Sequence, residues 1–387
     1  MSSETTADAG TGTAAVPTAV PNAAVTRILT ELRMLRESPT REAVLETAAL
    51  LVGALFFVIG FVVALLSFWG HVLPITGPGS IGVFASVSGA VTAAASFVLG
   101  RLSVRPDGAP EMRDGFVEPG QRLRWYDLIA IGFAHAAIAL LGWIGIAQLL
   151  ELSFQDAPVY AFPGGVLIGV ALALTAYVCY LSAAALDPMN LSLVLAIFLV
   201  VGAFAAMLAA TDKHWWRDNL SALGQTTNGS APAFNATIIA AGVMVTTIAR
   251  YATAALPTGT REERRGRGIV RAGLILLGIF LACVGIFPVD AFFLLHNTVA
   301  TGMAAVFAVV VVGLPWFLRD LPRAFIWLGW IYVLVIALLG IFFATGYYNL
   351  TAVELIAAVL IFSWIIVFLR TASVAHAAGR GPQPAAS

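Results

Sequence analysis

The chain has 387 residues, of which 60% are hydrophobic and 11% are charged, and its formal net charge is zero. Soluble domains carry about 25% charged residues, so this composition excludes an ordinary water-soluble protein and favours a surface that faces lipid. The lack of net positive charge argues against a nucleic-acid partner. The basic residues are nearly all arginine, as a GC-rich genome would produce, which suggests a bacterial source.

The N-terminal 24 residues are rich in Ala, Thr and Ser, and they lack the charged start and apolar core of a cleavable signal peptide. We expect residues 1–24 to form a disordered cytoplasmic tail. Residues 25–45 place Leu and Ile on one helical face and Arg and Glu elsewhere, which predicts an amphipathic helix on the inner leaflet. A short cytoplasmic helix without membrane contact is the alternative.

Apolar stretches of about 20 residues, long enough to cross a hydrocarbon layer of about 30 Å, recur along the chain. Backbone groups in lipid must be hydrogen-bonded within their own segment, so these stretches are predicted to be helices. The ten predicted spans are residues 47–69, 79–100, 126–148, 161–186, 190–211, 234–256, 269–287, 293–316, 323–346 and 350–370. The predicted fold is therefore an all-α polytopic membrane bundle. It divides into a four-helix region at 46–187 and a six-helix domain at 188–372, followed by a disordered tail at 373–387.

The arginines indicate the orientation of the spans. They gather before the first span and in the loops after the second, sixth, eighth and tenth spans. With an even number of spans, all these segments fall on one side, and the opposite side has only Lys213 and Arg217. Cytoplasmic loops carry the excess of Lys and Arg, which predicts a plasma (inner) membrane protein with both termini in the cytoplasm.

The longest outer loop opens with a dense polar and aromatic cluster at residues 212–224. The motif Asp218-Asn-Leu-Ser221-Ala-Leu-Gly224 is followed by Phe234-Asn235 and Gly242, and then by Gly285-Ile-Phe-Pro288-Val-Asp290 and His296 with Ala300. Over residues 190–370, this pattern resembles family 998 of the domains of unknown function, which are six-helix membrane proteins of bacteria and archaea. That family is similar to the FRAG/DRAM/SFK superfamily, whose eukaryotic members include proteins linked to lipid-anchor remodelling and phospholipid asymmetry. The resemblance implies no settled activity and does not cover the first four helices.

One set of outer residues has the side-chain types of nucleophilic hydrolysis or acyl transfer: Ser221, His296 and an acid, either Asp290 or Asp218. Serine is a weak nucleophile until a base removes its proton, and the base needs a third group to fix its tautomer. A site at the outer membrane boundary would suit a lipid ester. Ser221 lies in no Gly-x-Ser-x-Gly elbow, so the alternative is that these residues hydrogen-bond the loop in place.

A second set of outer residues is expected to contact a lipid headgroup or another ligand. It comprises His214, Trp215, Trp216, Arg217, Asn235 and Glu354. Arg217 suits a phosphate, although a tryptophan pair at this level is also an ordinary interfacial anchor. Glu354 is a candidate because an acid inside a span is costly to bury. The histidines show no HExxH motif or paired spacing, so no metal site is predicted.

Three classes of function remain open. The favoured one is a membrane protein that handles or senses a lipid at the extracytoplasmic face. The alternatives are an integral-membrane lipid hydrolase or transferase, and a small-molecule transporter or accessory subunit. A transporter would place charges near the bilayer midplane. Only His135 lies there, and it is expected to be neutral and bonded to another helix. No cofactor motif is present. The predicted partners are membrane lipids and a membrane protein packed on the first four helices.

Overall fold

A computed structural model describes residues 41–103, 125–186, 188–254, 256, 258–319 and 321–379. The chain divides into two units, Met1–Thr47 and Ala48–Ser387, and the contacts described below all lie within the second unit. Among the described residues, ten helices are long and apolar enough to cross a membrane. The predicted all-α, multi-pass membrane fold is confirmed.

The described chain consists of helices and one short strand pair. In chain order the elements are α2 (Arg41–Phe68), β1 (Val72–Leu73), α3 (Ile81–Ser103), α4 (Trp125–Ser153), β2 (Val159–Tyr160), α5 (Ala161–Ala184), α6 (Pro188–Leu208), the 3-10 helices η1 (Trp215–Arg217) and η2 (Leu220–Gly224), α7 (Ala231–Ala254), α8 (Arg261–Ile286), α9 (Phe293–Phe317), α10 (Arg323–Ala344) and α11 (Leu350–Gly379). The two strands pair in antiparallel register, with Val72 opposite Tyr160. They therefore tie the loop after α2 to the loop before α5.

Three helices extend furthest beyond the predicted apolar spans. α8 begins at Arg261 because Thr260 and Glu263 form a capping box, which keeps its polar first turns helical. α2 begins at Arg41, so residues 41–45 belong to the helix of the first span. α11 continues to Gly379 through an alanine-rich segment of good helix propensity, so the tail predicted from 373 is wrong up to that residue. The tail at 1–24, most of the predicted amphipathic helix and residues 380–387 lie outside the described residues.

Among the first four helices, α3 packs against both α4 and α5. Glycine allows the close approach to α4, since a Cβ at Gly89 would lie 2.8 Å from the Trp143 ring. The mid-span histidine bonds to another helix as predicted. His135 Nε2 lies 2.9 Å from the Ser182 hydroxyl of α5, and its Nδ1 lies 2.8 Å from the Ile131 carbonyl. Because a carbonyl only accepts, Nδ1 carries the proton and Nε2 accepts from Ser182.

The last six helices share a large hydrophobic core. α7 and α8 approach closely at a pair of glycines, because a Cβ at Gly242 would collide with the Gly278 carbonyl oxygen. Near the far end of α11, the fully buried Trp364 stacks on Phe325 and Phe368, with ring centroids 5.3 Å apart in both pairs. These contacts join α10 to α11.

One ion pair links the first four helices to the last six. Asp127 of α4 is 1% exposed, and its carboxylate lies 3.4 Å from the Arg250 guanidinium of α7. The Arg250 side chain also donates to the Tyr126 hydroxyl and lies 5.2 Å from the centre of that ring. A buried carboxylate needs such a partner. α4 also packs along α6 and α7, so the ion pair sits in a continuous helical contact.

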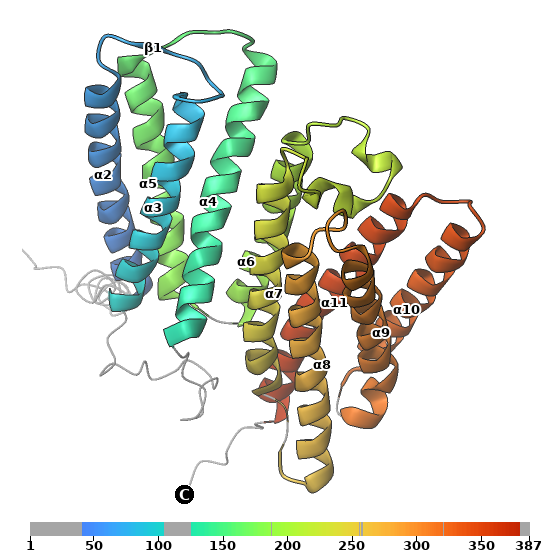
Figure 1. Ribbon diagram of the computed structural model, residues 1–387. Coiled ribbons are helices and arrows are strands. Elements are labelled where there is room, and N and C mark those ends of the chain that lie inside the picture. Colours follow the sequence, from blue (N-terminus) through green and yellow to red (C-terminus); the bar gives the residue numbers. More distant parts are fainter. Residues whose placement is uncertain are drawn as a thin grey trace, which may run out of the picture. The chain divides into compact units, whose positions relative to one another are not determined.

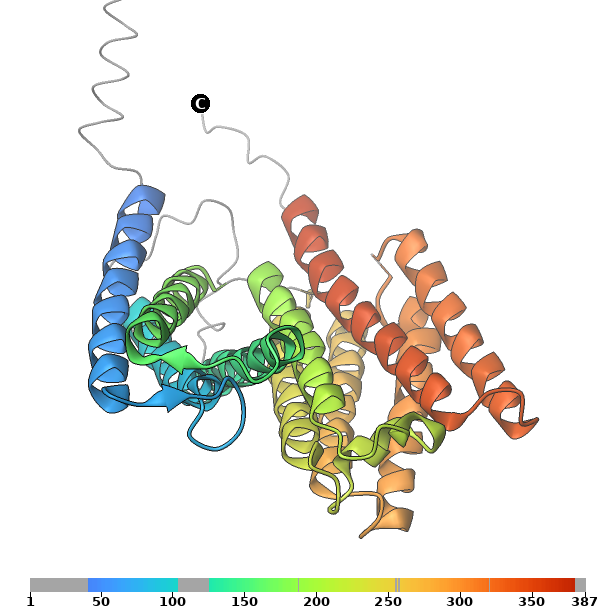
Figure 2. The ribbon, with the colours of Figure 1, turned by 90° about the horizontal axis from the view of Figure 1, so that it is seen from above.

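The loop with η1 and η2 lies beside the beginning of α11 in both views (Figure 1, Figure 2). Successive helices from α6 to α11 alternate in direction (Figure 1). The ends of α6, α8 and α10 therefore share one side with the beginnings of α7, α9 and α11 (Figure 1). The arginine-rich beginnings of α8 and α10 lie on the opposite side. The candidate site is at the loop-bearing end.

Candidate functional site around Ser221 and His296

The loop between α6 and α7 is held in shape by side chains that accept from or donate to its own backbone. The Ser230 hydroxyl donates to the Leu223 carbonyl over 2.7 Å, and the Asn228 side-chain amide donates to the Ala222 carbonyl over 3.1 Å. Leu223 is fully buried, which anchors η2 to the helices below it. A short 3-10 helix leaves carbonyl groups without internal partners, and these side chains supply them.

Ser221 and His296 meet inside this structure. His296 stands on the first turn of α9, and its Nε2 lies 3.0 Å from the Ser221 hydroxyl oxygen on η2. Ser221 is 8% exposed and His296 is 3% exposed, so bulk water does not compete for this bond. The two residues are far apart in the chain, and only the packing of α9 against the loop brings them together.

The tautomer of His296 is set by a backbone group. Its Nδ1 lies 2.7 Å from the carbonyl oxygen of Phe287, the residue that follows the last turn of α8. A carbonyl can only accept, so in the neutral ring Nδ1 carries the proton and Nε2 has its lone pair directed at Ser221. The Ser221 hydroxyl is therefore the donor in the pair. This is the arrangement in which an imidazole acts as a general base toward a serine.

The structure brings neither predicted acid to His296. Instead, the Asp290 carboxylate accepts from both the backbone N–H and the hydroxyl of Thr226, over 3.0 and 2.5 Å. Asp218 is exposed at the end of η1, where its backbone N–H donates to Trp215. The expected role of an acid is filled by the Phe287 carbonyl, because the chain turns directly after α8 and presents that oxygen to the ring.

Asp290 provides a pH-dependent clamp on the loop. The hydrogen bond from the Thr226 side chain, more than any other contact, holds the pKa of the Asp290 carboxyl below its usual value. A lowered pKa means that the clamp is fully formed above the ordinary value of about 3.9 and is lost as the pH falls through the lower value of the folded protein. We expect amide exchange in residues 225–230, corrected for intrinsic rates, to increase below about pH 4.

In the Asp290→Asn variant this pH dependence should disappear, because the amide does not titrate in that range. Hydrogen exchange with mass spectrometry, measured on the same peptide from pH 3 to pH 7, checks both proteins. An equal rise in the wild type and in the Asn variant would assign the effect to another group.

Glu354 reaches the same loop from α11. Its carboxylate accepts from the Leu220 backbone N–H over 2.6 Å and interacts with the N–H of Ser221 as well. Two nearby polar atoms, Asn219 Oδ1 and Thr351 Oγ1, are buried and form no hydrogen bond with the described residues. Glu354 was predicted as a ligand-binding residue, but the structure places it against the backbone of η2.

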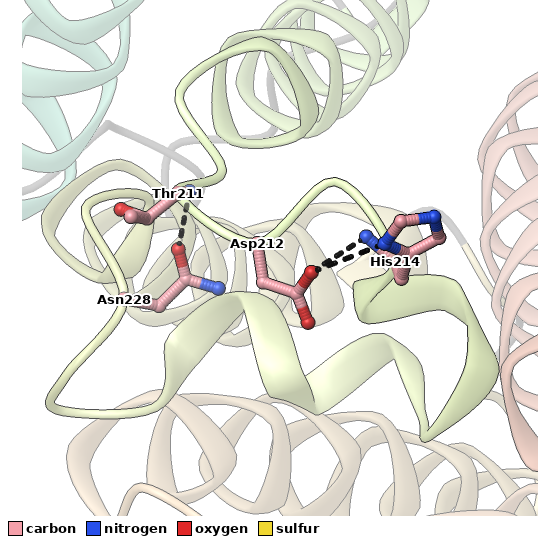
Figure 3. Close-up of polar contacts among 4 residues, drawn as sticks. All are labelled: Thr211, Asp212, His214 and Asn228. Atoms are coloured by element: carbon pink, nitrogen blue, oxygen red, sulfur yellow. Dashed lines mark hydrogen bonds and ion pairs between the residues drawn. The ribbon is translucent and has the colours of Figure 1, made fainter.

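The other predicted ligand-binding residues lie on or beside the loop. The Asp212 carboxylate accepts from the His214 backbone N–H over 2.8 Å and lies 3.8 Å from its ring, as Figure 3 shows. Trp215 packs inward against a small core that contains Leu223. Trp216 is exposed, and the Arg217 guanidinium lies 5.5 Å from the centre of its ring. Across the described residues, no group of three or more His, Cys, Asp or Glu is arranged to hold a metal.

Asn235 and the motif glycines form the packing directly under η2. The Asn235 side-chain amide donates to the Gly224 carbonyl over 3.0 Å, and a Cβ at Gly224 would collide with that same amide. A Cβ at Gly285 would lie 2.8 Å from the Asn235 backbone oxygen. Glycine is needed at both positions because backbone and side chain approach too closely for any larger residue. The motif residues thus hold the loop, α7 and α8 at the spacing that places Ser221.

Sequence reasoning missed two groups that shape the site. The Phe287 carbonyl is a backbone atom, and no residue type could have revealed it. Thr226 lies in a stretch of small polar residues, and its one signal in the sequence was that the predicted spans place it on the same side of the membrane as Asp290. The roles of the Phe287 carbonyl and of Thr226 are visible only in the folded structure.

The comparison with known families covers the part of the chain that carries this site. Residues 192–371 match the family model described as Protein of unknown function (DUF998). The predicted resemblance is confirmed over these residues. The matched region contains Ser221, His296, Asp290, Asn235 and Glu354, so the whole candidate site lies within it. No curated protein and no solved structure matches the chain.

Proposed function

We propose that this protein handles a lipid at the extracytoplasmic boundary of the membrane, and that it does so by acyl transfer at Ser221. The observation that carries the proposal is the Ser221–His296 hydrogen bond of 3.0 Å, with the histidine tautomer set by Phe287. The arginine distribution supports an extracytoplasmic position for the loop. The span-end location favours an ester of a membrane lipid as the substrate.

The reaction follows from the protonation state of the pair. Ser221 Oγ attacks the ester carbonyl carbon while its proton passes to His296 Nε2. The resulting tetrahedral intermediate breaks its bond to the leaving alcohol, which receives the proton from His296. A second alcohol gives transfer, and water gives hydrolysis. His296 accepts the proton of that alcohol or water as its oxygen bonds to the acyl carbon, and the proton then passes to Ser221 Oγ as the bond between Oγ and the acyl carbon breaks. The low exposure of Ser221 requires the loop to open for the substrate to enter.

A fluorophosphonate reagent tests the proposal without knowledge of the substrate. In attacking it, an activated serine forms an O–P bond, releases fluoride and gives up its proton to the base. We expect the protein in lipid nanodiscs to be labelled once, and the Ser221→Ala variant to lose the label. Intact-mass spectrometry and peptide mapping measure both results.

The chain offers a matched control for this experiment. Ser182 also donates to a buried histidine over 2.9 Å, but it lies within helix α5 and not in a loop. The Ser182→Ala variant should be labelled like the wild type. A folded wild-type protein that resists the reagent would refute acyl transfer at Ser221. Lipid handling would then have to proceed through binding alone, with Trp216 and Arg217 as the first contacts to replace.

A further inference from the structure

At the opposite end of the bundle, arginines from α7 and α8 come together near the beginning of the α8 span. Arg271 of α8 donates through Nε to the Thr253 hydroxyl of α7 over 2.8 Å. Thr253 is fully buried, and its own hydroxyl donates to the Ala249 carbonyl over 2.7 Å. The Arg271 guanidinium is thus held in one orientation by a neutral partner.

The charge around Arg271 is unbalanced. The like charges of Arg267 and Arg250 both act on it. Within the described part of the chain, neither Arg267 nor Arg271 forms an ion pair, and Arg250 is paired with Asp127. Among the described residues, only one of these three guanidinium groups is thus balanced by a carboxylate. Like charges held together repel, and partial burial increases the cost because water screens them less.

The depth of this group fits a lipid headgroup. α8 rises about 1.5 Å per residue, so Arg271 lies about 15 Å along the helix from its start at Arg261. The apolar sequence of α8 begins near Arg271 and not at Arg261. The beginning of α4 lies beside it, with Trp125 exposed and Tyr126 against Arg250, as expected at a membrane interface. Arginine binds phosphate through two parallel N–H groups, and a fixed guanidinium loses less freedom in doing so.

We propose that Arg250, Arg267 and Arg271 form a binding site for the phosphate of an anionic membrane lipid. The phosphate balances the excess positive charge of the three arginines. The acyl chains of the lipid lie along the apolar faces of α7 and α8. This site is independent of the reaction proposed at Ser221, because it lies at the other end of the helices and uses none of the same residues.

The test compares the thermal stability of the protein in nanodiscs of phosphatidylcholine alone and of phosphatidylcholine with phosphatidylglycerol. A ligand that binds only the folded protein raises the melting temperature. We expect phosphatidylglycerol to raise it for the wild type, and the Arg267→Gln/Arg271→Gln double variant to lose at least half of that shift. The variant should still melt cooperatively in phosphatidylcholine, which separates loss of binding from loss of folding.

Two controls make the result specific. The Arg261→Gln/Arg319→Gln variant removes the same charge from exposed arginines at the same end of the bundle, and it should keep the full shift. The Thr253→Val variant keeps every charge but frees Arg271, and it should lose part of the shift. Equal losses in the two double variants would show a general charge effect and overturn the proposal. Inorganic phosphate that reproduces the shift in phosphatidylcholine nanodiscs would overturn a lipid as the ligand.

Discussion

Replacing His296 by glutamine is expected to slow the labelling of Ser221 by about 10²- to 10⁴-fold, which is the usual contribution of a general base. Glutamine can still accept a hydrogen bond from the serine, but it cannot take up the proton as the new bond forms. The measurement is the pseudo-first-order rate of fluorophosphonate labelling, followed by intact mass in nanodiscs of fixed composition. The wild type and the variant should reach the same final stoichiometry, because the nucleophile itself is unchanged.

The second buried histidine supplies the control for this experiment. His135 also accepts from a serine and also donates to a backbone carbonyl, so His135→Gln disturbs the same kind of contact within the helices. We expect its labelling rate at Ser221 to remain within a few-fold of the wild type. If both variants slow equally, the effect comes from lost stability and His296 is not the base.

The Glu354→Leu variant is expected to open the loop that carries Ser221. The carboxylate accepts from the half-buried Leu220 N–H, and loss of such an acceptor leaves the donor without a partner, at a cost of about 1–3 kcal/mol. Amide exchange in residues 219–224 should therefore become about 5- to 150-fold faster, since 1.4 kcal/mol corresponds to a factor of ten. Hydrogen exchange with mass spectrometry measures this directly.

A conservative variant and a distant one show whether Glu354 acts by positioning η2. Glu354→Gln keeps an oxygen acceptor for Leu220 and should recover most of the protection. Glu151→Leu removes a carboxylate from the last turn of α4, where it accepts from the Asp156 N–H of the following loop, and it should leave residues 219–224 unchanged. Normal protection in Glu354→Leu would mean that other contacts, such as those of Asn228 and Ser230, hold the loop.

The helix boundaries show where local sequence is sufficient and where it is not. The apolar spans were recognisable because lipid imposes a simple requirement on length and composition. The start of α8 was not, because its first turns are polar and depend on the capping box of Thr260 and Glu263. The α4–α7 ion pair was missed for a related reason. Asp127 opens its helix like any N-terminal acid, and its burial depends on Arg250, far along the chain.

The sequence by itself determined that this is a multi-pass membrane protein, because only helices satisfy the backbone in lipid and ten long apolar runs leave no other fold. It also singled out Ser221 and His296, since few polar residues occur at that level. Only the tertiary structure decided which groups meet. It paired His296 with the Phe287 carbonyl, directed Asp290 to Thr226 and placed Glu354 on the η2 backbone. Hydrogen bonds are made over about 3 Å between atoms, so residue type and span level cannot determine them before the packing of α7, α8, α9 and α11 sets the distances.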